Sequence, residues 1–125
     1  MLFDTDVLIW LMRGNLAAAK VAQESARRVL SVVVYMELLQ GCRSKSDCQT
    51  IRSFLTNLAF EVVPLTENIG HRAAVYVEEH AASSGMRVAD ALVAATAVEH
   101  GVPLCTADQK HYRLVADLAL RSFKP

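Results

Sequence analysis

The stretch MLFDTDVLIWLM, residues 1–12, guides the interpretation of the rest of the sequence. Residues 1–4 suit a short strand that runs directly into Thr5. Residues 7–12 are apolar, and the punctuation at Arg13-Gly14-Asn15 would end a short helix over them. A strand followed directly by a helix indicates an α/β protein if the same pattern continues along the chain.

The pattern does continue. Helices are expected over residues 16–28, 35–40, 51–58, 66–83 and 88–99, with one turn of helix at 108–112. Strands are expected at residues 29–34, 60–63, 103–106 and 118–123, and residues 44–47 read as a polar loop. Because one or two helices separate the strands, we expect a single domain over residues 1–125. Its fold class would be a three-layer α/β/α sandwich around a parallel sheet of four or five strands.

The composition restricts the possible functions. Thirteen basic and thirteen acidic residues cancel, so the chain lacks the basic excess of a general polyanion binder. Its three cysteines show no metal-ligand or disulfide spacing, which favours a reducing cytoplasm. No basic leader precedes an apolar segment, and no apolar run is long enough to span a membrane. We therefore expect a cytoplasmic protein whose chemistry depends on local groups.

Four acids stand in apolar surroundings. Asp4 shares residues 1–12 only with Asp6, Glu37 is the only charge in residues 29–42, and Asp90 is the only charge in residues 88–98. Asp108 directly follows an apolar strand. None of the first three segments contains a basic residue. A carboxylate in such surroundings is costly unless it is paired, protonated or bound to a cation.

Convergence on one divalent ion would satisfy the acids together. Asp4 and Asp108 follow strands, whose carboxyl ends gather at one crevice, and Glu37 and Asp90 lie on helices that can face it. Hard oxygen ligands suit Mg²⁺ or Mn²⁺ better than Zn²⁺ or Cu²⁺. Each acid also has a simpler interpretation. Asp90 can be a first-turn acid, Asp108 a helix cap and Glu37 a partly exposed residue, while Asp6 is a first-turn acid that can approach the metal through water.

Other catalytic motifs are missing. The sequence has no glycine-rich phosphate-binding loop and no G-x-S-x-G, and its histidines share no metal-ligand spacing. Asp4-Thr5-Asp6 resembles the D-x-D motif of haloacid-dehalogenase-like phosphatases, but Val7-Leu8 stands where that family has Gly-Thr. This phosphatase, and a non-catalytic domain that binds RNA or a partner protein, are the alternatives.

The same four acids carry a resemblance to the PIN-domain family, and in particular to VapC-type toxins. The resemblance covers essentially the whole domain. The matching stretches are Asp4-Thr5-Asp6-Val7-Leu8-Ile9, Tyr35 to Gly41, Asp90 to Ala97, and Thr106-Ala107-Asp108 leading to His111-Tyr112. Their order and intervals are typical of the family. One departure is Ala107, where related chains often have a basic residue.

This resemblance implies a PIN-like, Rossmann-like fold and a metal-dependent endoribonuclease of a type II toxin–antitoxin system. It makes Asp4, Glu37, Asp90 and Asp108 the catalytic and metal-binding residues, with Mg²⁺ or Mn²⁺ as cofactor. Thr106 and Thr5 become their hydroxyl neighbours. The implied partners are an RNA substrate, a small antitoxin that inserts a segment near the site, and a second copy of the chain. Candidates for contact with the RNA backbone are Arg43, Lys45, Arg87, Lys110 and Arg113.

Overall fold

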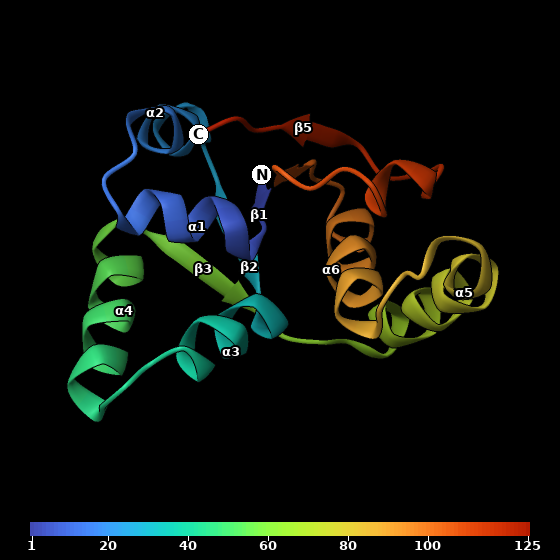
Figure 1. Cartoon of the computed structure of the whole chain (residues 1–125), viewed down its shortest axis with the longest axis horizontal. Coiled ribbons are helices and arrows are strands. Elements are labelled where there is room, and N and C mark those ends of the chain that lie inside the picture. Colours follow the sequence, from blue (N-terminus) through green and yellow to red (C-terminus); the bar gives the residue numbers. More distant parts are fainter.

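Five short parallel strands form the centre of the computed structural model, which describes residues 1–125 (Figure 1). The strands are β1 (Leu2–Phe3), β2 (Arg28–Ser31), β3 (Phe60–Val63), β4 (Leu104–Thr106) and β5 (Leu120–Ser122). Their order across the sheet is β3-β2-β1-β4-β5. The register pairs Leu2 with both Val29 and Leu104, so β1 lies between β2 and β4.

Six α-helices cover the sheet. They are α1 (Thr5–Met12), α2 (Leu16–Glu24), α3 (Val32–Gln40), α4 (Lys45–Asn57), α5 (Glu67–Ser84) and α6 (Val88–Glu99). The chain steps from β1 to β2 to β3 in one direction and then returns to place β4 on the other side of β1. Since parallel crossovers are right-handed, the helices before β3 and those after it lie on opposite faces. Figure 1 accordingly shows α1, α2 and α4 grouped apart from α5 and α6. The expected three-layer α/β/α fold is confirmed.

The core joins these layers through the central strands. Leu2 and Phe3 of β1 are completely buried, and the ring of Phe3 packs edge-on against Phe60 with their centroids 5.3 Å apart. Helix α6 buries a run of mostly small residues, Ala91 and Val93 to Ala97. Such small side chains let α6 pack closely against the sheet and α5. Asp90 is therefore held at one end of a deeply buried helix. No helix is both long and apolar enough to cross a membrane.

Several expected boundaries were wrong, mostly because of helix caps. Helix α3 begins at Val32, where β-branched residues had predicted continued strand, because the Ser31 hydroxyl accepts a hydrogen bond from the Val33 backbone. Helix α4 begins at Lys45, inside the expected loop, because Ser44 caps the backbone of Asp47.

Other elements are shorter than expected or shifted along the chain. Helix α2 ends at Glu24 and not at residue 28, because Arg28 already pairs with Phe60 in the sheet. The expected turn at 108–112 is instead a 3₁₀ helix at Tyr112–Leu114, and the last strand covers only Leu120–Ser122.

Candidate functional site

A cavity of about 210 Å³ lies where β1 and β4 end. The acids Asp4, Glu37, Asp90 and Asp108 all line it, together with Asp6 and Tyr112. Its position follows from the topology, since the chain changes direction across the sheet between β1 and β4 and leaves a crevice at their carboxyl ends. The structure thus brings all four acids singled out in the sequence to one place.

Asp4 occupies the most enclosed position. It is the N-cap of α1, and its Oδ1 accepts a hydrogen bond of 2.9 Å from the Thr5 backbone. Its Oδ2 accepts a second bond of 2.9 Å from the hydroxyl of Thr106, which is fully buried. Burial, followed by the nearby Asp6 carboxylate, raises the pKa of Asp4 to about 6. Hydrogen bonds only partly offset this cost, and no ion pair includes Asp4.

Asp6 does more than complement the first turn of α1. Its Oδ2 accepts a hydrogen bond of 3.0 Å from the backbone of Ala107, and the Thr106 hydroxyl lies 3.5 Å from the same oxygen. The side chain thereby fastens the loop after β4 to the start of α1. This tether keeps Asp108 close to Asp4, and nothing in the local sequence indicated it.

Glu37 and Asp108 are the exposed acids of the group. Glu37, on α3, accepts a hydrogen bond of 2.9 Å from the Thr5 hydroxyl. The backbone of Asp108 donates to the Thr106 hydroxyl at 3.0 Å, and its carboxylate accepts from the Lys110 backbone at 3.2 Å. Thr5 and Thr106 are therefore hydroxyl neighbours of the acids, as the resemblance implied.

Asp90 and Tyr112 form the remaining wall of the cavity. Asp90 lies in the first turn of α6, and the Tyr112 hydroxyl donates to its Oδ1 over 3.4 Å. Tyr112 is only 2% exposed. Burial, together with the carboxylates of Asp4 and Asp90, raises the pKa of Tyr112, so its hydroxyl remains a hydrogen-bond donor. The family resemblance included Tyr112 beside His111 but gave it no role.

No basic side chain neutralises the cavity. The ion pairs of the molecule join other residues, such as Arg27 with Glu61 and Arg72 with Glu99, and none includes the four acids. Arg87, at the N-cap of α6, is exposed and makes no side-chain capping bond. The other candidates for RNA contact are also exposed and outside the ion pairs: Arg43, Lys45, Lys110 and Arg113.

The donor set suits a hard divalent cation. In their present positions, no three acidic, histidine or cysteine side chains lie close enough together to hold a metal ion. The two exposed acids, Glu37 and Asp108, can turn toward a cation without disturbing the core. Carboxylate oxygens are the ligands that Mg²⁺ and Mn²⁺ prefer, and a cation would remove the charge imbalance around Asp4. The residues therefore fit such an ion.

Thr106 allows a direct test of how the site is held. Replacing it with valine keeps its shape but leaves Asp4 Oδ2 and the Asp108 backbone without their common partner. We expect a loss of about 1–3 kcal/mol in the free energy of unfolding, measured with urea. Thr106→Ser keeps the hydroxyl and removes one methyl group, so it should lose only about 1 kcal/mol. Equal stability of Thr106→Val and the wild type would show that these hydrogen bonds do not organise the site.

Comparisons with known proteins agree with this fold. A chain of a toxin–antitoxin complex from Klebsiella pneumoniae has a similar fold, with 24% identity, 94% of each chain covered and a TM-score of 0.78. A chain of VapBC2 from Rickettsia felis, bound to a promoter DNA fragment, matches with 17% identity, 98% of each chain covered and a TM-score of 0.82. A chain of VapBC-1 from nontypeable Haemophilus influenzae matches with 21% identity, 97% of this chain and 96% of that chain covered, and a TM-score of 0.80. At these identities the likeness establishes the fold. No curated protein matches significantly in sequence. Residues 1–117 match the PIN domain, and the chain belongs to the PIN-domain family.

Proposed function

We propose that the protein is a metal-dependent endoribonuclease and the toxin of a toxin–antitoxin pair. The observation that carries the proposal is the set of four acids around one cavity, none of them paired with a basic side chain. Membership of the PIN-domain family adds the reaction class, and the titles of the similar structures add the toxin–antitoxin setting.

Asp4 and Asp90 would hold Mg²⁺ or Mn²⁺, with Glu37 and Asp108 binding directly or through water. When bound, such an ion lowers the pKa of water and offsets the negative charge of the reacting phosphate. The reaction is hydrolysis of a phosphodiester bond by in-line attack of water, which leaves a 5′-phosphate and a 3′-hydroxyl. The ribose 2′-hydroxyl need not take part in it.

The surrounding residues position the acids for this task. Thr106 holds Asp4, Thr5 holds Glu37, and the Tyr112 hydroxyl holds Asp90. Holding Asp4 and Asp90 in place reduces the reorganisation needed when substrate arrives, while the exposed Glu37 can turn toward the ion. Since the cavity itself is acidic, contacts to the RNA backbone must come from its rim, where Arg43, Lys45, Arg87, Lys110 and Arg113 remain the candidates.

A second cavity supports the proposed antitoxin partner. It has a volume of about 390 Å³, is largely apolar, and lies between α1, α3 and α4. Ile9, Met12 and Ile51 line it, and it shares Thr5 and Glu37 with the acidic cavity. An apolar segment of the antitoxin would bind here and end beside the acids.

A homodimer is also part of the proposal. Helices α5 and α6 share a shallow apolar patch lined by Ala74, Val77, Val88 and Leu92. Val88, the first residue of α6, is 64% exposed and adds to this patch of neighbouring apolar side chains. Burial of this patch against a second copy would remove it from water.

The decisive experiment treats end-labelled RNA with purified protein in Mg²⁺, in Mn²⁺ and in EDTA. We expect cleavage with either metal and none in EDTA, with 3′-hydroxyl ends on the upstream fragments. Undiminished cleavage in EDTA would contradict the proposal. Phosphate release from p-nitrophenyl phosphate without RNA cleavage would favour the phosphatase, although no lysine lines the cavity to support that alternative. Metal-independent binding of RNA without cleavage would favour the non-catalytic domain.

A further inference from the structure

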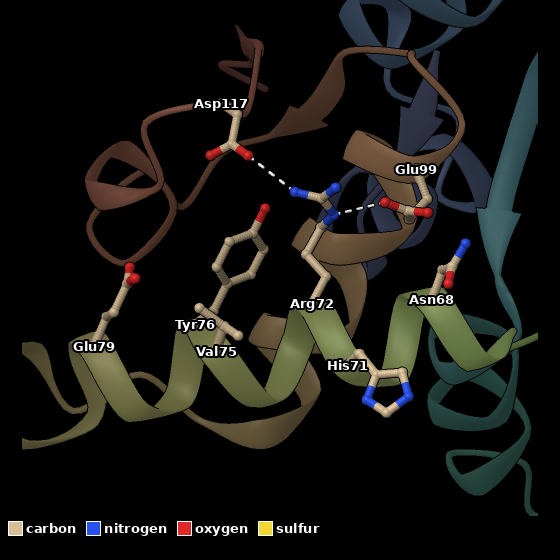
Figure 2. Close-up of a pocket in the computed structure, with 8 residues that line it drawn as sticks. All are labelled: Asn68, His71, Arg72, Val75, Tyr76, Glu79, Glu99 and Asp117. Carbon is tan, nitrogen blue, oxygen red and sulfur yellow. Dashed lines mark hydrogen bonds and ion pairs between the residues drawn. The ribbon is translucent and has the colours of Figure 1, made fainter.

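A separate cleft of about 610 Å³ lies between α5, the end of α6 and the segment before β5 (Figure 2). It shares no residue with the acidic cavity. Asp90 lies in the first turn of α6 and Glu99 ends the helix, so the two sites are separated by roughly 13 Å along the helix at about 1.5 Å per residue. The volume is within the range of small-molecule sites.

Arg72 lies at the centre of the cleft and is already paired twice. Its Nε donates to Glu99 at 2.6 Å, and its Nη1 donates to Asp117 at 3.0 Å. Glu79 adds a third carboxylate to the lining. Its Oε2 lies 3.5 Å from His80 Nε2, and this contact is an ion pair only when His80 is protonated. Three carboxylates, one guanidinium and His71 thus line the cleft, and only Glu99 and Asp117 contact the guanidinium. The cleft has an excess of negative charge and of hydrogen-bond acceptors, which disfavours an anion and favours a cation.

The hydroxyl of Tyr76 is a second, independent feature of the cleft. Tyr76 is only 5% exposed, and its hydroxyl is buried without any hydrogen-bond partner. Figure 2 shows this hydroxyl directed toward the space between Arg72 and Asp117. The Arg72 guanidinium lies beside this hydroxyl, and its Nε and Nη1 donate to Glu99 and Asp117. A buried hydroxyl without a partner is costly, so this oxygen can accept a hydrogen bond from a donor that enters the cleft.

We propose that this cleft binds an organic cation through a guanidinium or primary ammonium group. Such a group supplies several N–H donors and a positive charge, which match the free oxygens of Glu79, Glu99 and Asp117 and the unpartnered hydroxyl of Tyr76. The cation is either a free polyamine or a basic side chain of another protein. The proposal does not depend on the ribonuclease function, because the two sites have no residue in common.

Titration of the full chain with agmatine, followed through backbone amide NMR shifts in EDTA, tests the proposal. The amides of residues 68–79 and of Asp117 should shift to saturation in the millimolar range. The amides around Asp4 and Asp90 report separately on any binding to the acidic cavity. Spermidine and a short arginine peptide then distinguish the two sources. Tighter binding of spermidine would indicate a free polyamine, and tighter binding of the peptide would indicate a basic side chain of another protein. Absence of saturable shifts at the cleft, or larger shifts with inorganic phosphate, would overturn the proposal.

Two variants and one control locate the binding. Glu99→Gln removes a charge from the cleft and should weaken agmatine binding about tenfold. Tyr76→Phe removes only the unpartnered hydroxyl, so it should weaken binding about fivefold without lowering the melting temperature. Glu78→Gln removes an exposed charge from α5 outside the cleft and should bind as the wild type does. Wild-type affinity in Tyr76→Phe or in Glu99→Gln would also overturn the proposal.

Discussion

Replacement of Asp90 by asparagine is expected to lower the rate of RNA cleavage at least about 100-fold, because loss of partners that merely orient metal ligands already costs about 10–100-fold. The asparagine side chain would keep an oxygen that accepts the Tyr112 hydroxyl, which now bonds to Asp90 Oδ1, so the fold should survive. What the variant loses is one negative charge among the proposed metal ligands. Single-turnover cleavage of labelled RNA in Mg²⁺ measures the effect, with circular dichroism as the check on folding.

Glu78→Gln is the matched control for the Asp90 variant. It neutralises one carboxylate on an exposed face of α5 and should cleave RNA at the wild-type rate. Because Asp108 is exposed, Asp108→Asn should lose less activity than the Asp90 variant. Cleavage by Asp90→Asn at the rate of the control would mean that the carboxylates are structural, and the nuclease proposal would have to be abandoned.

The acids could be found from the sequence because each breaks a local pattern. Asp90 is the only charge in residues 88–98, and a charge on a fully apolar helix is informative whatever the fold. Asp4 and Asp108 could be placed near one another because both follow strands of a parallel sheet. Their common cavity then depends only on β1 and β4 being neighbours, which the structure shows.

The residues that hold the acids could not be found in this way. The hydroxyl of Thr106 reaches Asp4 across 102 positions of sequence, and Asp6 fastens the Ala107 backbone across 101. Such pairs depend on register and loop geometry, which no local pattern encodes. The start of α3 shows the same limit, because one capping bond from Ser31 outweighed the strand propensity of three valines. Tyr112 was missed because an aromatic residue after a strand usually belongs to the core, and most of its surface does.

Without a bound metal, the buried charge of Asp4 should lower the free energy of unfolding of the protein. Asp4 keeps its proton up to a pH of about 6 in the fold, against an ordinary value of 3.8. Between these values the native state binds more protons than the unfolded state, so the free energy of unfolding falls as the pH rises. The interval corresponds to roughly 3 kcal/mol at about 1.4 kcal/mol per pKa unit. Above pH 6 the whole penalty is present, and below about pH 4 it is absent.

Asp4→Asn should therefore be more stable than the wild type at pH 7 in EDTA, by about 1–3 kcal/mol, because asparagine can still cap α1 and carries no charge to bury. At pH 4 the two proteins should be equally stable. Urea unfolding at several pH values measures the difference, and comparing the two proteins cancels the titration of the other acids. Mg²⁺ should reverse the order at pH 7, since it binds only the wild-type site tightly. A wild type that is the more stable protein at pH 7 without metal would mean that the charge of Asp4 is already compensated within the fold, and the physical reason for a cation at this site would disappear.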